Sequence, residues 1–159
     1  MSNNFRYVRG NTKPVFLAPA SATVIEIGDL VYLDSSTKKP KPASDQADGG
    51  ALATNQENFH DAFIGVAEQA SANGDTDDIR IATAGEFDFP CDSATFDLGD
   101  LIGPVENSDG DELEDQKVVE VAAENLAIGR VSEAVGTAAT SVRFRIESTV
   151  MAGGPQAAA

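Results

Sequence analysis

Residues 141–147 read Ser-Val-Arg-Phe-Arg-Ile-Glu, the clearest strand pattern in the chain. Val142, Phe144 and Ile146 alternate with charged or polar residues. In an extended backbone, the apolar side chains therefore point to one face and the others to the opposite face. This period of two predicts a half-buried β-strand with its two arginines on the solvent side.

Short apolar runs of this kind recur along the chain and alternate with turn-forming residues, which is typical of an all-β protein built from short antiparallel strands. No window of a dozen residues has the apolar period of a helix, and only Thr54–Asp61 is expected to form one or two helical turns. The other expected strands are Thr23–Ile27, Leu30–Leu33, Phe63–Glu68, Asp78–Ala82, Glu86–Phe89, Val118–Val121 and Ile128–Ala134. The expected loops are Ser35–Lys39, Ser71–Asp77 and Asn107–Asp115.

The two halves of the chain share a pattern. Residues 25–31 read Ile-Glu-Ile-Gly-Asp-Leu-Val, and residues 96–102 read Phe-Asp-Leu-Gly-Asp-Leu-Ile. Further on, Ile-Gly-Val at 64–66 and Ile-Gly-Arg at 128–130 each precede another apolar strand. Each half would be a strand, a Gly-Asp turn, a second strand and a hairpin. Two interpretations are open: an internal duplication, or chance reuse of a common turn dipeptide.

Charge is distributed unevenly along the 159 residues, which carry 26 acidic and 11 basic side chains and a formal net charge of −15. Between Ala43 and Gly129 the basic residues are Arg80 and Lys117 alone. Nucleic acid binding requires cations that displace the counterions of the phosphates, so this composition argues against a nucleic acid partner.

The two ends differ from the expected β-domain, residues 14–148. Residues 1–13 contain no acid, and they combine aromatic with basic side chains, which suggests an extended N-terminal arm that docks on a partner. The alternative is an edge strand of the same fold. Residues 149–159 have little to bury and are expected to form a flexible tail. Neither a leader peptide nor a membrane span is expected.

Catalytic and metal-binding patterns are sparse. His60 is the single histidine and is expected in a polar loop, while Cys91 is expected to be a half-buried residue after a strand end. The carboxylate of Asp92 would raise the pKa of that thiol, which argues against a reactive cysteine. Neither a nucleophile-elbow nor a phosphate-loop pattern is present. We therefore predict a protein that is not an enzyme and needs no cofactor.

Acidic clusters are the remaining candidates for ion binding. They lie at Asp75–Asp78 and at Asp109–Asp115, but their spacing does not match the calcium loop of an EF-hand. Runs of this kind are more often solvated turns, so no metal site is predicted.

One family resemblance covers roughly residues 14–147. Residues 84–90 read Ala-Gly-Glu-Phe-Asp-Phe-Pro and are followed by the Gly-Asp turn at 99–100, while 128–131 and 142–146 read as a closing hairpin. Together with residues 27–34, these motifs resemble the small phage head decoration, or capsid cement, proteins. The polar insertion Asp45–Asp61 and the acidic middle of the chain depart from that pattern.

The resemblance implies a compact β-barrel or β-tulip domain that binds the major capsid protein on the outer surface of the virion, as a homo-oligomer and most commonly a trimer. It implies no membrane partner. On this hypothesis the basic and aromatic residues of the N-terminal arm form the capsid contact, namely Phe5, Arg6, Tyr7, Arg9 and Lys13.

Two other classes of function are compatible with the sequence. A cation-dependent adhesin-like or carbohydrate- or receptor-binding β-module, as in a head fibre or tail component, would use the acidic clusters. A carboxylate-based hydrolase would need two paired acids in a cleft, and the chain has no tryptophan and only two tyrosines to form a sugar platform.

Overall fold

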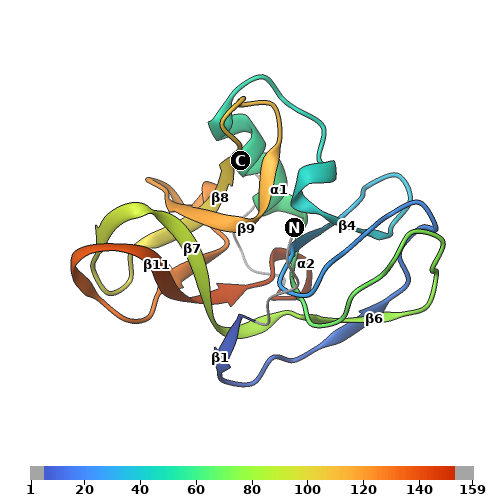
Figure 1. Cartoon of the computed structure of the whole chain (residues 1–159), viewed down its shortest axis with the longest axis horizontal. Coiled ribbons are helices and arrows are strands. Elements are labelled where there is room, and N and C mark those ends of the chain that lie inside the picture. The colour runs from blue at the N-terminus through green and yellow to red at the C-terminus, as the bar shows by residue number, and fades with distance from the viewer. Residues whose placement is uncertain (1–5, 153–159) are drawn as a thin grey trace.

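Two antiparallel sheets lie side by side in the computed structural model, which describes residues 6–152 (Figure 1). The prediction of an all-β fold is confirmed. The first sheet has the order β2 (Val15–Leu17), β6 (Ile79–Ala82), β5 (Phe63–Ala67), β3 (Leu30–Leu33), β4 (Pro40–Pro42). The second has the order β1 (Tyr7–Arg9), β7 (Ala84–Phe96), β11 (Val135–Glu147), β10 (Gly129–Val131), β8 (Leu101–Glu106), β9 (Leu113–Glu120).

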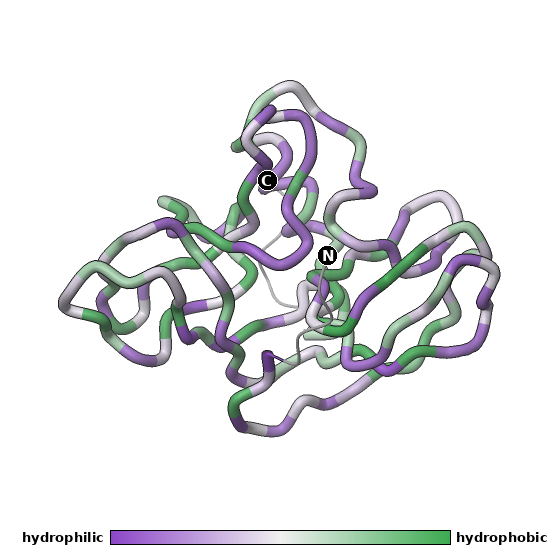
Figure 2. Tube along the Cα trace, in the orientation of Figure 1, coloured by the Kyte–Doolittle hydropathy of each residue, from purple (hydrophilic) through white to green (hydrophobic). Residues whose placement is uncertain are grey.

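The second sheet curls until β9, the strand at its end, meets β7, and the two strands pair at the parallel bridge between Val118 and Cys91. The curl encloses the apolar face that the sequence predicted for β11. Val142, Phe144 and Ile146 are all buried, and the arginines between them face outward. Figure 2 shows hydrophobic segments interspersed with polar ones along the chain.

The helical content differs from the expectation. The chain forms a three-turn helix, α1 (Leu52–Ala62), where one or two turns were expected. This helix buries polar as well as aromatic side chains, so its inner face has no apolar period. Gln56 donates a hydrogen bond to the carbonyl of Pro104 at 2.8 Å, and Asn55 donates one to Glu106 at 2.9 Å. The short helices are η1 (Ala43–Asp45), η2 (Glu124–Leu126) and α2 (Thr149–Ala152).

Several strand boundaries also differ from those expected. The segment Thr23–Ile27 is not a strand: Ile25 alone forms a bridge, to Ser71, because the backbone turns immediately afterwards. The expected loop Asn107–Asp115 ends earlier, since β9 begins at Leu113. At the termini, residues 7–9 pair with β7 as an edge strand, which was the alternative to a free arm. Residues 149–152 form α2 against α1 and β5.

The two sheets repeat one topology. Counting along the chain from β2 and from β7, the five strands of each unit follow the same order in space, with the first strand next to the fifth and the fourth next to the second. The registers agree as well. Val31 pairs with Gly65 in the first sheet, and Ile102 pairs with Gly129 in the second. The shared sequence pattern therefore corresponds to a structural repeat.

The Gly-Asp turns are equivalent in detail. Gly28 and Gly99 have φ of 94° and 90°, in the region that favours glycine. Asp29 Oδ2 accepts a hydrogen bond from the backbone N–H of Glu26 at 2.8 Å, and Asp100 Oδ2 accepts one from that of Asp97 at 2.7 Å. Each aspartate closes its turn in the same way, which explains the recurrence of the dipeptide.

Polar side chains join the two sheets, and we call them the seam: the buried Asp29, Asp115 and Gln116 and the partly buried Ser44. Gln116 on β9 donates to Asp29 Oδ1 at 2.8 Å. The backbone N–H and the hydroxyl of Ser44 donate to the carboxylate of Asp115 at 2.7 and 3.0 Å. Burial raises the pKa of Asp115 to about 7, and the nearby carboxylates of Asp29 and Asp45 add to the rise against the Ser44 hydrogen bonds.

Two glycines at the repeat's strand pairs leave no room for a side chain. A Cβ at Gly65 would lie 1.6 Å from the carbonyl oxygen of Ala82, and one at Gly129 would lie 2.1 Å from that of Arg145. We expect Gly65→Ala and Gly129→Ala each to lower the free energy of unfolding by about 3 kcal/mol or more, because the paired strands must separate. Denaturant unfolding measures this. Gly136→Ala, where the space is open, is the control, and equal stability of all three variants would contradict the close approach.

The seam predicts a pH dependence of stability. Because the pKa of Asp115 is raised on folding from the ordinary value of about 4, its contribution is fully present below pH 4 and is lost as the pH rises through 7. Asp115→Asn keeps hydrogen-bonding groups for Ser44 without the charge. We expect this variant to be more stable than the wild type at pH 8, by on the order of 3 kcal/mol, and to differ little at pH 4.

Thermal unfolding across that pH range, with the exposed Asp109→Asn as a charge-matched control, makes the comparison. Parallel pH profiles for the wild type and Asp115→Asn would show that Asp115 titrates at its ordinary value.

Candidate docking surface

The residues predicted to form the capsid contact divide into two groups. Phe5 lies outside the described residues. Arg6 and Tyr7 point into the protein: Arg6 donates to Gln116 Oε1 from Nε and Nη2 at 3.2 and 2.8 Å, and its guanidinium lies 5.4 Å from the centre of the Phe89 ring. The ring of Tyr7 meets Phe87 edge to face at 5.9 Å. Both side chains therefore help to hold β1 on β7.

Arg9 and Lys13 are exposed and lie at the same edge of the second sheet. The Arg9 side chain is 63% exposed, and its Nε donates to Glu86 at 3.0 Å. Lys13 follows a tight bend with φ of 43°, in which its backbone N–H donates to Asn11 Oδ1 and its carbonyl accepts from Thr83 Oγ1. These two cations are the part of the predicted site that remains available to a partner.

Strand register adds two more arginines to them. Arg130 on β10 lies opposite Arg145 on β11, Arg145 lies opposite Glu86 on β7, and Glu86 lies opposite Arg9 on β1. We call these four residues, in line across the outer face of the second sheet, the arginine row. Two arginines directly opposite each other are unfavourable for a strand pair, so folding alone does not favour this arrangement.

Glu86 sits in the middle of the row. Its side chain is only 4% exposed, and its two carboxylate oxygens accept separate hydrogen bonds at 3.0 Å, one from Arg9 Nε and the other from Arg145 Nε. Burial by itself would raise the pKa of Glu86, but the hydrogen bonds and charges of the two arginines outweigh it and hold the pKa below its usual value. Glu86 is therefore ionised at neutral pH.

The neighbouring arginine on β11 is bonded differently. Arg143 donates from Nε and Nη2 to the two oxygens of Asp88, at 2.9 and 3.1 Å, and from Nη1 to Glu133 at 2.9 Å. These acids raise the pKa of Arg143 above its usual value. All three nitrogens of this guanidinium have an acceptor inside the protein. It stabilises the strand pair, and it is not equipped in the same way to bind a partner.

Two hollows flank Arg145. One has a volume of about 380 Å³ and is bordered by Arg9, Lys13 and Glu86. The other, of about 710 Å³, is bordered by Arg130 and by Leu98, whose side chain is 72% exposed. Arg145 therefore borders both hollows. Charged and polar residues line the smaller one, Leu98 and Val131 add apolar side chains to the larger one, and side chains of another protein could enter either.

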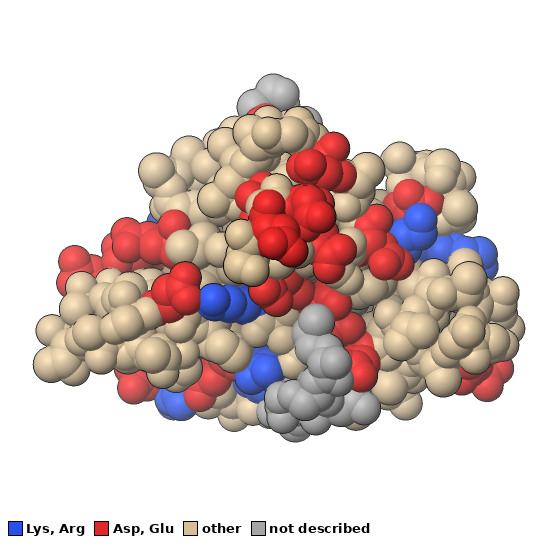
Figure 3. All heavy atoms as spheres, turned by 45° about the horizontal axis from the view of Figure 1, so that its top comes forward, with Lys and Arg blue, Asp and Glu red and all other residues tan. Residues whose placement is uncertain are grey.

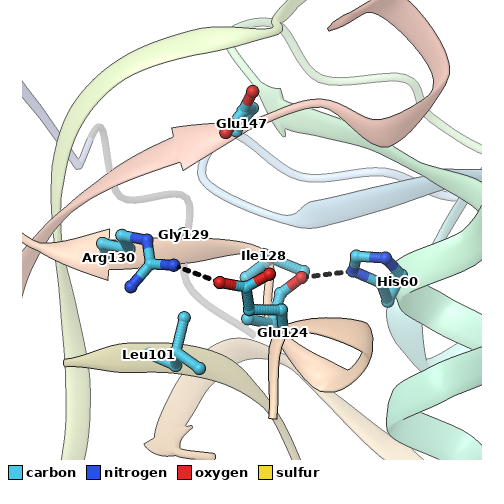
Figure 4. A pocket seen from close by; sticks show the side chains of 8 residues that line it. His60, Leu101, Glu124, Ile128, Gly129, Arg130 and Glu147 are labelled. Carbon is cyan, nitrogen blue, oxygen red and sulfur yellow. Dashed lines mark hydrogen bonds and ion pairs between the residues drawn. The ribbon is translucent and has the colours of Figure 1, made fainter. Parts of the chain in front are cut away.

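A third hollow, of about 310 Å³, adjoins the far end of the row. Figure 4 shows Arg130 turned toward Glu124, to which its Nη2 donates at 2.7 Å, with His60 on the opposite side. The expectation of a loop histidine is wrong. His60 lies on α1, is 2% exposed, and has Nδ1 2.5 Å from the carbonyl oxygen of Ala127. It ties α1 to the segment that follows η2, a role that a polar sequence context does not reveal.

Cys91 also differs from its prediction. It lies within β7 and is buried, whereas a half-buried position after a strand end was expected. Burial raises the pKa of its thiol, and the charge of Asp92 raises it further. A protonated, buried thiol is a poor nucleophile, in agreement with the interpretation of Cys91 as unreactive.

The acidic side chains gather elsewhere. Figure 3 shows them concentrated over the end of the molecule that carries α1 and the β8–β9 turn, with lysines and arginines few on the same face. Among residues 6–152, no group of three or more histidine, cysteine or acidic side chains is arranged to hold a metal ion. Within the same range, no helix has the length and apolar character needed to cross a membrane.

Neither the protein-family models nor the curated proteins include a match to this chain. The candidate site therefore rests on its geometry. Arg9 and Lys13 were predicted from the cluster of N-terminal cations. Glu86, Arg130 and Arg145 were not predicted as partners of that cluster, because strand register joins Arg9 to Glu86 across 77 positions and Glu86 to Arg145 across 59.

Proposed function

We propose that this protein decorates and stabilises the outer surface of a phage capsid, and that the arginine row is its contact with the major capsid protein. One observation supports this most strongly: Arg9 and Arg145 share a single acidic partner, Glu86, within residues 6–152 of a chain whose net charge is −15, and the exposed Lys13 borders the same hollow. A local reversal of charge on an acidic body restricts binding to one face and one orientation.

Comparison of the two repeat units also favours the outer face of the second sheet as the binding surface. By register, the first-sheet counterparts of Glu86, Arg145 and Arg130 are Pro14, Ala82 and Val66. Val66 and Ala82 are buried in the main core, so this face of the first sheet is apolar and covered. The second sheet leaves the same face exposed and charges it. The fold does not require arginines there, which favours a role in binding.

Decoration fits these properties physically. A protein that binds the assembled capsid but not its free subunits stabilises the assembly by mass action. A homotrimer would present three arginine rows, and simultaneous attachment would retain it even if each contact were weak. The acidic surface away from the row would face solvent and repel nucleic acid released from lysed cells.

Point substitutions test the proposal better than deletion of residues 1–13, because β1 covers Phe87 and belongs to the sheet. We expect the double variant Arg9→Gln/Arg145→Gln to bind phage capsids at least about tenfold more weakly than the wild type, since two charge-assisted contacts are lost. Sedimentation with purified capsids measures the bound fraction. Arg80→Gln, which removes a partly exposed arginine of the first sheet that is likewise paired through Nε, is the matched control.

A wild-type chain that stays in the supernatant while capsids sediment would contradict the proposed function. Equal capsid binding by the double variant and the wild type would agree with a capsid partner but would exclude the arginine row as the contact. Calcium-dependent binding to cells or glycans in the absence of capsid binding would favour the adhesin-like module instead.

A further inference from the structure

We infer that the arginine row recognises an acidic protein segment, whose carboxylates bind the outer ends of Arg9 and Arg145, and that Glu86 is the positioning residue that presents these ends. The inference rests on the proposed function for the identity of the partner as a capsid protein. Its chemistry follows from the geometry of the three side chains.

Each arginine binds Glu86 through its Nε atom. Arg9 and Arg145 each use Nε to bind one oxygen of the carboxylate, and within residues 6–152 the Nη groups of the two side chains make no hydrogen bond. A guanidinium held through Nε alone leaves the outer N–H of each Nη group, at the far end of the side chain, available to another acceptor. These are the groups that form parallel hydrogen bonds with a second carboxylate.

We call the Glu86 carboxylate with its two Nε hydrogen bonds the clamp, and the burial of Glu86 fixes it in place. The Glu86 side chain is 4% exposed, whereas those of Arg9 and Arg145 are 63% and 72% exposed. The carboxylate of Glu86 is therefore buried, and the two guanidinium groups that it binds lie at the surface. Long arginine side chains lose rotamer freedom when they bind a partner, and a pre-bound Nε removes part of that loss before the partner arrives.

The surroundings favour a protein segment over a nucleic acid. A phosphate polymer would bring its dense negative charge against a body of net charge −15, which opposes binding beyond the row. The hollow beyond Arg145 is bordered by Val131 and the exposed Leu98, so it offers apolar contact next to the cations. An extended segment in which acidic and apolar residues alternate matches this combination.

A defined peptide provides the test. The probe is acetyl-Glu-Leu-Glu-Leu-Glu-amide, titrated into the full-length protein while the side-chain Nε–H signals of Arg9 and Arg145 are followed by NMR. We expect Arg9→Gln and Arg145→Gln each to weaken binding by about fivefold, the scale of one exposed charge-assisted contact, and Arg80→Gln to leave it unchanged. Replacement of the three glutamates by glutamine should abolish binding.

Glu86→Gln separates positioning from simple charge attraction. This substitution removes a negative charge from between the two arginines, so attraction alone predicts tighter binding of the acidic peptide. Loss of the clamp predicts weaker binding, by about threefold or more, because the two side chains must then be ordered by the peptide itself. Glu86→Asp, which keeps the charge but shortens the reach, should fall between the wild type and Glu86→Gln. The amide NMR spectrum verifies that each variant is folded.

Unchanged or tighter binding by a folded Glu86→Gln variant would overturn the positioning role. Inorganic phosphate that shifts the same signals at the same concentration as the peptide would overturn recognition of a protein segment. The capsid sedimentation assay is independent of both results. Capsid binding without peptide binding refutes this inference alone, and peptide binding without capsid binding refutes the proposed function alone.

Discussion

The register between β7 and β11 places both the core and the arginine row. It aligns Phe87 with Phe144 and Phe89 with Val142 on the inner face, and all four side chains are at most 1% exposed. The same register aligns Glu86 with Arg145 on the outer face. A slip of one residue would move every side chain of one strand to the opposite face, so the core and the arginine row are fixed by one set of hydrogen bonds.

The structural repeat shows how one topology meets two different surroundings. Both units close their first turn with a Gly-Asp pair and both place a glycine where two backbones approach closely. They differ in what covers the face that carries the arginine row in the second sheet. In the first sheet the equivalent face is part of the main core through Val66 and Ala82, while in the second sheet this face is exposed to solvent. The two sheets therefore share one backbone topology, and the burial of this face distinguishes the sheet that packs in the core from the sheet that offers a candidate binding surface.

The seam and the row are contrasting uses of carboxylates in an acidic protein. Asp115 is buried with neutral hydrogen-bond donors and with other acids nearby, and its pKa is raised. Glu86 is also buried but has a guanidinium on each oxygen, and its pKa is lowered. Desolvation acts on both in the same direction, so their partners decide that Glu86 is ionised at neutral pH while Asp115 is still partly protonated. The ionised Glu86 is the carboxylate that orients cations at the surface.

Local sequence patterns predict the all-β class, the faces of β11, the Gly-Asp turns and the concentration of cations near the N-terminus. These features depend on the period of a strand, the φ preference of glycine and the residues' own charges, all of which are local. The tertiary structure decided which strands are neighbours, and hence that Arg9 and Arg145 share Glu86. It also decided that α1 buries His60 and Asn55, whose polarity suggested exposure. Pairing and burial join residues far apart in the chain, and no local pattern encodes them.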